Sequence, residues 1–461
     1  KAPRTRQLLN QFGGKVGGPV LLPGTGFNKN RDKLFFFVDY EEYRLPEAQL
    51  RTRTILSPNA QNGIFQYSIN LGAAAATPAP CTRTSATTAN CSVNVFNLAA
   101  ANGFTNTPDP TVGGLLSAIR ASTAGGSINQ LSDPNVQQFT FQNRGLQKRR
   151  FPTGRLDWNL TKNQHVEAIY NYQQFAPSVD FLNNADPAFP GFPNFGSQAS
   201  NRFSAVAALR STITSRLVNE FRFGLTGGTT LFFPENNAGQ FTNQGGFALT
   251  ISDAASGISN ATSINSPQRR NSPVKQLFET VTYVRGQHNF NFGGNFTQVN
   301  AFLVSAPGGA VPTVSFAQDV NDPVTNIFDT PFFPGASVTQ LTQAENLYRV
   351  LTGRVSNISG TAALNEAGTA YTFQGNFIER YREREFGFFG QDTWRIRPNL
   401  TLTMGLRYDL QYAPVSQNNA LTQNSFAGLF GTSGTNLNAL FRPGATGGSP
   451  TQFTRLPPGQ H

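Results

Sequence analysis

Residues 382–410 carry an alternation of apolar and polar side chains that limits the fold more than any other feature of the chain. From Leu400 to Leu410 every even-numbered residue is apolar and every odd-numbered residue is polar or glycine. A period of two predicts a β-strand with one apolar and one polar face. Residues 385–396 alternate in the same sense, and Arg397-Pro398-Asn399 joins the two arms as a tight turn, because proline presets φ and asparagine tolerates turn geometry. The segment is therefore predicted to form a β-hairpin of the kind that spans a membrane.

The composition favours a membrane β-barrel over an ordinary soluble domain. Charged residues make up 13% of the 461 residues, against about 25% in a typical soluble domain. Aromatic residues make up 12%, yet the mean hydropathy is -0.31, so the polarity comes from Asn, Gln, Ser, Thr and Gly. This balance is typical of strands that alternate lipid-facing apolar and lumen-facing polar residues. No apolar run approaches the roughly 18 residues of a transmembrane helix, so a membrane location requires an all-β, antiparallel transmembrane β-barrel.

The same alternation recurs along the chain and predicts further strands joined by short turns. Residues 34–40 and 48–55 are predicted as two strands separated by a bend at Arg44-Leu45-Pro46. With a first strand near residues 12–20, the count is roughly eleven strands. Single-chain bacterial barrels have an even number, so we expect an incomplete barrel and a chain that is a piece of a longer protein. The predicted strand regions are about 11–56, 151–175, 203–228, 274–299 and 384–412.

Long segments rich in Gly, Pro, Asn, Ser and Thr separate the hairpins and lack a sustained period. A compact soluble domain rarely carries several such loops, whereas outer-membrane barrels combine short periplasmic turns with long extracellular loops. We therefore expect the short turns to face the periplasm. The predicted extracellular loops are about 57–150, 176–202, 229–273, 300–383 and 413–461.

Two features lie within these loops. Cys81 and Cys91 are ten residues apart with no histidine or third cysteine nearby, which favours a disulfide over a metal site in an oxidising compartment. A short helical pattern is expected to pack within its loop and not to bind a partner. Its residues are Leu341, Glu345, Leu347, Tyr348 and Leu351.

The two faces of the strands are assigned to different surroundings. Trp158 and Trp394, the only tryptophans, precede short turns on the apolar face, where an interfacial aromatic girdle belongs. The polar face supplies candidates that either line a pore or form a generic ladder of internal charges. These lumen-facing candidates are Arg155, Asp157, Glu167, Glu220, Arg222, Gln391, Arg395, Arg407 and Asp409.

The net charge of +11 raises the question of nucleic-acid binding. The basic clusters lie on no predicted helix and match no nucleic-acid motif, so we expect no nucleic-acid partner. The clusters Lys148-Arg149-Arg150 and Arg380, Arg382 and Arg384 fall near outer strand ends. Arginine binds phosphate in bidentate fashion, which makes lipopolysaccharide a candidate partner.

The sequence gives no sign of an enzyme. Its three histidines, His165, His288 and His461, are far apart, and no catalytic, phosphate-loop or zinc-binding motif occurs. Paired carboxylates such as Glu41 and Glu42 fall in predicted strands, as lumen-facing or interfacial charge. We expect no catalytic residue, no metal site and no cofactor.

Several motifs, in order and spacing, resemble the TonB-dependent outer-membrane transporters, specifically the Oar-like β-barrel group. They extend from about residue 10 to residue 412 and cover most of the strand-forming parts of the chain. The motifs are Asn10-Gln11-Phe12-Gly13-Gly14, Gly17-Gly18-Pro19, Lys33-Leu34-Phe35-Phe36-Phe37, Leu217-Val218-Asn219-Glu220-Phe221-Arg222-Phe223-Gly224, Gly286-Gln287-His288, Phe388-Phe389-Gly390-Gln391-Asp392-Thr393-Trp394 and Gly405-Leu406-Arg407-Tyr408.

The resemblance implies a plugged barrel of about 22 strands in the cell outer membrane, of which this chain would be the first half. It implies TonB-dependent uptake of an external ligand, with a plug, an N-terminal regulatory-like domain and a TonB-contacting segment that these residues do not include. A half-barrel with two unpaired edge strands is not expected to insert stably alone.

Two other readings remain open: an ungated porin or surface adhesion barrel, and a secreted soluble β protein that acts by interaction. Loop composition of this kind fits siderophores, glycans, peptides or whole proteins, so no ligand-binding residue is assigned.

Overall fold

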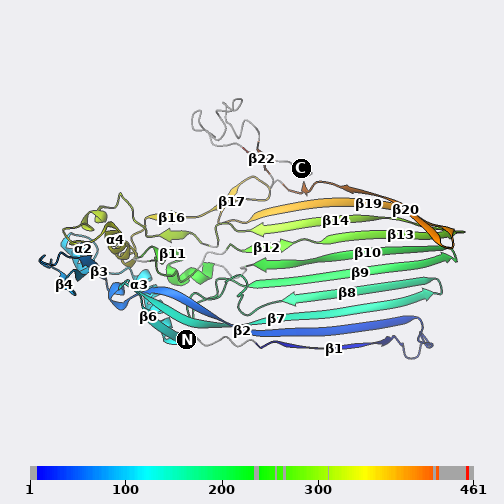
Figure 1. The fold of residues 1–461 in the computed structure, drawn as a ribbon, viewed down its shortest axis with the longest axis horizontal. Coiled ribbons are helices and arrows are strands. Elements are labelled where there is room, and N and C mark those ends of the chain that lie inside the picture. Colours follow the sequence, from blue (N-terminus) through cyan, green and yellow to red (C-terminus); the bar gives the residue numbers. More distant parts are fainter. Residues whose placement is uncertain are drawn as a thin grey trace, which may run out of the picture.

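The computed structural model describes residues 8–232, 238–254, 257–262, 266–309, 311–418, 422–424 and 453–455. One antiparallel sheet of 13 strands dominates them, and its long strands lie side by side (Figure 1). The predicted all-β, antiparallel fold is confirmed. In order along the sheet, the strands are β1 (Asn10–Pro19), β2 (Leu34–Leu56), β7 (Val136–Thr161), β8 (Gln164–Phe175), β9 (Gln198–Thr214), β10 (Leu217–Phe232), β12 (Gln268–Asn271) with β13 (Val274–Arg285), β14 (His288–Ser305), β19 (Phe377–Arg397) and β20 (Leu400–Gln411); β6 (Gly126–Gln130) pairs with β7, and β21 (Val415–Ser416) with β19.

Short turns join the long strands in pairs at one end of the sheet, on the right in Figure 1. They connect β7 to β8, β9 to β10, β13 to β14 and β19 to β20. In the turn between β13 and β14, Gly286 has φ +62°, a left-handed conformation that glycine adopts without steric cost. The long connections lie at the opposite end, as the alternation of turns and loops predicted.

The register of the ladders separates an apolar face from a polar one. Residues directly opposite each other in a ladder share a face, and Phe388 lies opposite Tyr408 while Trp394 lies opposite Leu402. The apolar side chains on this face are not covered by protein: Leu406 is 80% exposed. Such a face requires an apolar environment outside the chain.

The first hairpin differs from the prediction. Residues 34–56 form a single strand, β2, whose pairing with β7 continues without a shift through Arg44, Leu45 and Pro46. Beyond Arg44, β2 has no β1 partner in the described residues, so one side of the strand needs no ladder donor and tolerates proline. The predicted bend is therefore wrong, and the described sheet contains ten long strands instead of eleven, with β12 and β13 counted together.

The connections opposite the turns are folded, which sequence periodicity did not predict. β7 begins at Val136, within the segment predicted as loop up to residue 150.

We call the described residues of 57–135, 176–197, 238–267 and 306–376 the cap. Most of the predicted loop 413–461, with His461, lies outside the described residues. The elements of the cap besides β6 are α1 (Pro58–Gln61), β3 (Ile64–Asn70), β4 (Cys81–Arg83), β5 (Thr88–Asn94), α2 (Val95–Ala101), α3 (Pro110–Ser122), η1 (Thr123–Gly125), η2 (Ala238–Gln244), β11 (Ala248–Thr250), η3 (Ile251–Asp253), β15 (Thr313–Ser315), η4 (Pro323–Ile327), α4 (Val338–Thr352), β16 (Asn357–Ser359), β17 (Ala362–Leu364) and β18 (Tyr371–Phe373). The short β22 (Thr422–Asn424) and β23 (Phe453–Arg455) pair with each other.

The main hydrophobic core lies in the cap and at the adjoining ends of β2 and β7. The predicted helical pattern forms α4, in which Leu347, Tyr348 and Leu351 are buried in this core. It packs not only within its own loop but also on the loop from residue 57 to 135, since the Tyr348 hydroxyl donates to the Thr105 carbonyl. Ser337 begins α4 with a capping box, because its hydroxyl accepts from the Gln340 amide while the Gln340 side chain accepts from the Ser337 amide. Among the described residues, no helix has the length and apolar character needed to cross a membrane.

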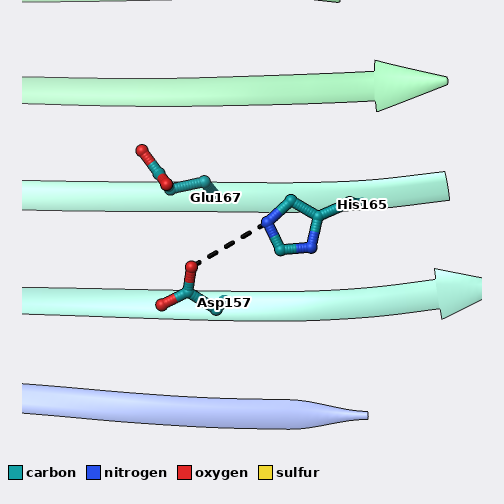
Figure 2. A group of neighbouring side chains, drawn as sticks. All are labelled: Asp157, His165 and Glu167. Carbon is teal, nitrogen blue, oxygen red and sulfur yellow. Dashed lines mark ion pairs between the residues drawn. The ribbon is translucent and has the colours of Figure 1, made fainter. Parts of the chain in front are cut away.

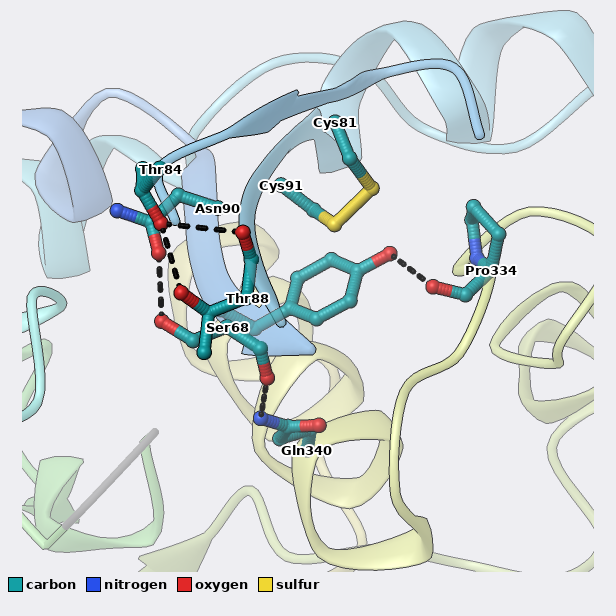
Figure 3. The surroundings of a disulfide bond; sticks show 9 residues. Ser68, Cys81, Thr84, Thr88, Asn90, Cys91, Pro334 and Gln340 are labelled. Atoms are coloured by element: carbon teal, nitrogen blue, oxygen red, sulfur yellow. Dashed lines mark hydrogen bonds between the residues drawn. A yellow bond between two sulfur atoms is a disulfide. The ribbon is translucent and has the colours of Figure 1, made fainter. Parts of the chain in front are cut away.

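A disulfide fastens a small sheet of the cap (Figure 3). Cys81 of β4 and Cys91 of β5 are bonded, with S–S 1.97 Å, and lie opposite each other in the ladder. The neighbouring strand β3 contacts the α4 region, because the Tyr67 hydroxyl donates to the Pro334 carbonyl at 3.3 Å and Gln340 Nε2 donates to the Ser68 carbonyl at 3.1 Å. The disulfide-bonded sheet and α4 therefore form one packed unit.

Candidate functional site: the polar face and the cap clefts

The structure places the predicted lumen-facing residues on the polar face of the sheet. One row of directly opposed residues crosses nine strands and includes four of the nine candidates. It runs through Phe35, Asp157, Glu167, Ala208, Arg222, Phe278, Asn295, Gly387 and Asp409. The strands thus bring together charged residues that lie far apart in the sequence.

A charged cluster surrounds Arg155 on this face. Asp157 of β7 and Glu167 of β8 lie directly opposite each other, an arrangement in which like charges destabilise a ladder. Arg155 Nη2 lies 2.7 Å from Asp157 Oδ1 and 2.7 Å from Glu167 Oε2. Its guanidinium therefore bridges the two carboxylates and offsets their repulsion.

His165 completes this cluster, although sequence reasoning gave it no role. Its Nε2 lies 3.9 Å from Asp157 Oδ1 (Figure 2), and its Nδ1 lies 2.8 Å from Asn159 Oδ1. Asp157, His165 and Glu167 offer ligand atoms within 4.8 Å of one another. Arg155 already contacts both carboxylates, so it supplies the positive charge that a metal ion would bring.

The remaining candidates form small, partly exposed groups. Arg407 pairs with Asp409 at 2.7 Å and donates to Asn295 Oδ1 at 3.1 Å, and Arg222 pairs with Glu220. Gln391 and Arg395 reach only long contacts of 3.5 Å. Partly exposed pairs of this kind contribute about 0–1 kcal/mol each. These groups make the polar face of the sheet a charged, solvent-accessible surface.

The two tryptophans lie on the apolar face near the short turns. Trp158 is 42% exposed and lies opposite Leu34 and Val166. Trp394 stacks on His288 with ring centroids 5.2 Å apart. Their role at a membrane interface remains a prediction.

Glu41 and Glu42 lie on opposite faces of the sheet. Glu42 shares the apolar face with Tyr40, is 5% exposed, and lies 3.4 Å from Lys148 Nζ and 3.6 Å from Arg150 Nε. Lys148 and Arg150 thus share the outer face, whereas Arg149 turns to the polar face and stacks on Phe175 at 4.8 Å.

Two adjoining clefts open in the cap, and sequence reasoning missed both. The larger, of about 600 Å³, lies beside α3, and the second, of about 560 Å³, lies beside β11. Thr262 lines both. The sequence did contain a signal for the start of α3, the pair Asp109-Pro110. Asp109 Oδ1 caps this helix by accepting from the amides of Thr111 and Val112 at 2.9 Å. Residues lining the larger cleft include Thr111, Gly114, Phe192, Asn243 and Gln244.

A buried ion network fixes α4 within the cap. Arg349 is 0% exposed and lies 3.0 Å from both Glu345 Oε1 and Asp322 Oδ2. Arg354 also pairs with Asp322, and its hydrogen bond lowers the pKa of that carboxyl. Tyr348 adds a hydrogen bond from its hydroxyl to the Thr105 carbonyl at 2.6 Å. The network thus joins α4 to η4 and to the segment before α3 within the cap.

An antiparallel sheet with an uncovered apolar face, a charged face, and short turns at one end with a large cap at the other defines a wall of a membrane β-barrel. The chain belongs to the outer membrane beta barrel domain family, whose model matches residues 1–455. This is a family of membrane barrels and not of enzymes, and it locates the chain in the cell outer membrane.

Two solved structures of outer-membrane proteins are similar to the chain. The outer membrane transporter YddB from Escherichia coli has 6% sequence identity and a TM-score of 0.41, over 90% of this chain and 36% of that one. The siderophore receptor PiuA from Acinetobacter baumannii has 11% identity and a TM-score of 0.28, over 92% of this chain and 47% of that one. This chain thus spans about a third to a half of their lengths. No curated protein sequence matches it significantly.

Proposed function

We propose that this chain forms part of the wall and the external cap of a transporter that takes up a ligand across the outer membrane with energy delivered by TonB. The observation that carries the proposal is the folded cap, with two adjoining clefts, at the end of the sheet opposite the short turns. Short turns face the periplasm in outer-membrane barrels, so the clefts open toward the outside of the cell. A packed cap with clefts suits ligand capture better than loops around an open pore would.

The charged face supports the path that follows capture. Arg155, Asp157 and Glu167 satisfy one another, so the wall offers water and polar ligands a hydrated surface without a strong net charge of its own at this point. The proposed roles of TonB and of a plug rest on the resemblance of the motifs to TonB-dependent transporters. In that scheme TonB pulls on the plug, and the ligand passes along the polar wall.

Energy-dependent depletion of solutes tests the proposal. Cells that express the intact protein and cells that carry the empty vector are grown in one complex medium, with and without a protonophore, and the spent media are compared by mass spectrometry. We expect at least one solute to be depleted by the expressing cells, and the protonophore to abolish that depletion. Depletion that the protonophore leaves unchanged, together with a large steady conductance in planar bilayers, would establish an ungated porin instead.

The role of the cap is tested by filling the larger cleft. A Cβ built at Gly114 of α3 meets nothing within 4 Å, and Gly114 lines the cleft. Gly114→Phe should therefore reduce uptake of the depleted solute at least about tenfold without disturbing the fold, since tenfold corresponds to about 1.4 kcal/mol of lost binding. Ser117→Phe, on the same helix but not lining that cleft, is the matched control. Equal uptake by both variants would remove the cleft from the ligand path.

A further inference from the structure

A row of arginines lies on the outer, apolar-side face of β19. Arg380, Arg382 and Arg384 lie opposite Phe302, Asn300 and Gln298 of β14, in the row that Phe386 and Phe388 continue toward the short turns. The alternate residues Glu379, Tyr381, Glu383 and Glu385 lie on the opposite face. At this cap-side end of β19 the arginines therefore point outward and the glutamates inward.

The position of this row along the strand matches the edge of a membrane. Arg384 precedes Arg397, the last residue of β19, by 13 residues. At a rise of about 3.3 Å per residue and a tilt of about 40°, this distance corresponds to about 33 Å across the membrane. The apolar band of an outer-membrane barrel is about 25 Å tall. The arginines therefore lie at the headgroup level, on the side of the cap.

Two of these arginines form part of a cleft with an apolar floor. It has a volume of about 270 Å³ and is lined by Arg382, Arg384, Phe386, Tyr412, Ala413 and Val415. The segment after β20 closes it, since the Tyr412 amide donates to the Arg384 carbonyl at 3.0 Å and Val415 lies opposite Arg382. Phe386 and Tyr412 meet edge to face with centroids 6.1 Å apart. Two guanidinium groups thus stand beside aromatic and aliphatic surface.

The positive charge in this cleft is only partly balanced by the protein. Arg380 pairs with Glu366 outside the cleft, and Arg384 Nε donates to the neutral Gln298 at 3.1 Å. The Arg382 side chain makes no hydrogen bond or ion pair within the described part of the chain. By contrast, another outward cluster, Lys148 and Arg150, surrounds the buried Glu42. The guanidinium groups of the β19 cleft are therefore available to bind an anion.

We propose that this cleft binds the phosphate-bearing headgroup of an outer-leaflet lipid, with Arg382 and Arg384 on the phosphate and the first acyl segment on Phe386 and Tyr412. Guanidinium groups bind phosphate oxygens through charge-assisted, bidentate hydrogen bonds. The outer leaflet of this membrane presents lipopolysaccharide, whose lipid part carries both phosphate and acyl chains. The assignment rests on the proposed orientation of the cap toward the outside and goes beyond uptake, because the occupant is a resident lipid and not the cargo.

The test compares lipid binding by variants of the intact protein. The protein is purified in detergent, stripped of lipid, and titrated with phosphatidylcholine vesicles that carry lipopolysaccharide or the same lipopolysaccharide after removal of its phosphates. We expect the wild type to bind the phosphorylated form at least about tenfold more tightly, and Arg382→Gln with Arg384→Gln to lose that preference. Arg395→Gln, on the same strand but on the polar face, is the matched control and should bind like the wild type.

Inorganic phosphate distinguishes a lipid site from a free-phosphate site. Because the apolar floor contributes to lipid binding, millimolar phosphate should leave vesicle binding within about twofold of its original value. Full competition by phosphate would overturn the lipid assignment. Equal binding of both forms of lipopolysaccharide by the wild type would overturn the proposal even if the glutamine variant did not fold. The result is independent of solute uptake, so it fails or succeeds separately from the proposed function.

Discussion

The wall and the cap are built by different forces. In the wall, apolar side chains such as Leu406 and Tyr408 are 80% and 62% exposed, and they gain stability only when lipid covers them. In the cap, Phe65, Phe333 and Leu347 are at most 1% exposed and pack on one another, as in a water-soluble domain. One chain therefore combines a surface that needs a membrane with a core that does not. Changes in either region should affect that region first.

The largest expected effect is in the cap. Replacing Arg349 by Met leaves Glu345 buried without its cation, which should cost about 3–5 kcal/mol. Hydrogen exchange of the α4 amides should accelerate by several hundredfold or more, while the wall strands remain protected. Adding Glu345→Gln should restore most of the protection, because the glutamine keeps a neutral partner for Thr325 and Gln318. If the single and double variants exchange alike, charge burial does not hold the cap together.

The corresponding change in the wall is Leu406→Arg. Leu406 follows Leu400, the first residue of β20 after the short turn, by six residues, which corresponds to a depth of about 15 Å, near the middle of the apolar band. We expect a loss of about 2–4 kcal/mol in insertion, measured as the folded fraction of the intact protein in vesicles against urea by heat-modifiable gel mobility. Thr403→Arg, on the polar face of the same strand, should cost less than about 1 kcal/mol. Equal costs would mean that the two faces do not differ in environment.

Low pH should affect the cap before the wall. The pKa of Asp322 is lowered by its hydrogen bond from Arg354, so this carboxylate stabilises the folded cap. That contribution is complete above the unfolded-state pKa of about 3.9 and is lost as the pH falls through the lower pKa of the folded state. The protection factors of the α4 amides, which correct for the intrinsic pH dependence of exchange, should therefore fall below about pH 4. Asp322→Asn should flatten this part of the pH profile, and an unchanged profile would assign the acid sensitivity elsewhere.

The smallest expected effect is on the polar face. Arg155→Gln leaves Asp157 and Glu167 opposed without their cation, at a cost of about 0.2–1 kcal/mol. It also frees Asp157, Glu167 and His165 to hold a divalent ion. Zinc should then raise the thermal midpoint of the variant but not of the wild type. Zinc stabilisation of both proteins would show that Arg155 does not occupy the place of a cation.

Sequence reasoning succeeded where one physical rule governed every residue. Between lipid and lumen each side chain faces one of two media, so a period of two predicted the strands from Leu400 to Leu410 and placed Arg407 and Asp409 on the polar face. This alternation no longer holds where the strands extend beyond the membrane. Phe139 and Phe141 on β7 are buried in the cap core, and the polar residues that follow face no lipid, so alternation no longer marked the strand.

The cap escaped prediction because its contacts join distant parts of the chain. Tyr67 meets Pro334 and Tyr348 meets Thr105, and no local pattern records such pairs. Local signals did exist at helix starts, with Asp109 before α3 and Ser337 before α4. They predict the helices but not the clefts between them. Likewise, proline at position 46 signalled a bend because the sequence does not reveal that β2 lacks a β1 partner there.

Accessibility along β20 tests most directly whether the two faces meet different media. Single cysteines at positions 401–410 of the intact protein can carry a nitroxide label, since Cys81 and Cys91 are bonded to each other. In bilayers, labels at even positions should be relaxed most by oxygen, which concentrates in lipid, and labels at odd positions by a water-soluble nickel chelate. The two profiles should alternate with a period of two and in opposite phase. Equal access of the nickel chelate to both faces would contradict the assignment of β20 to a membrane wall.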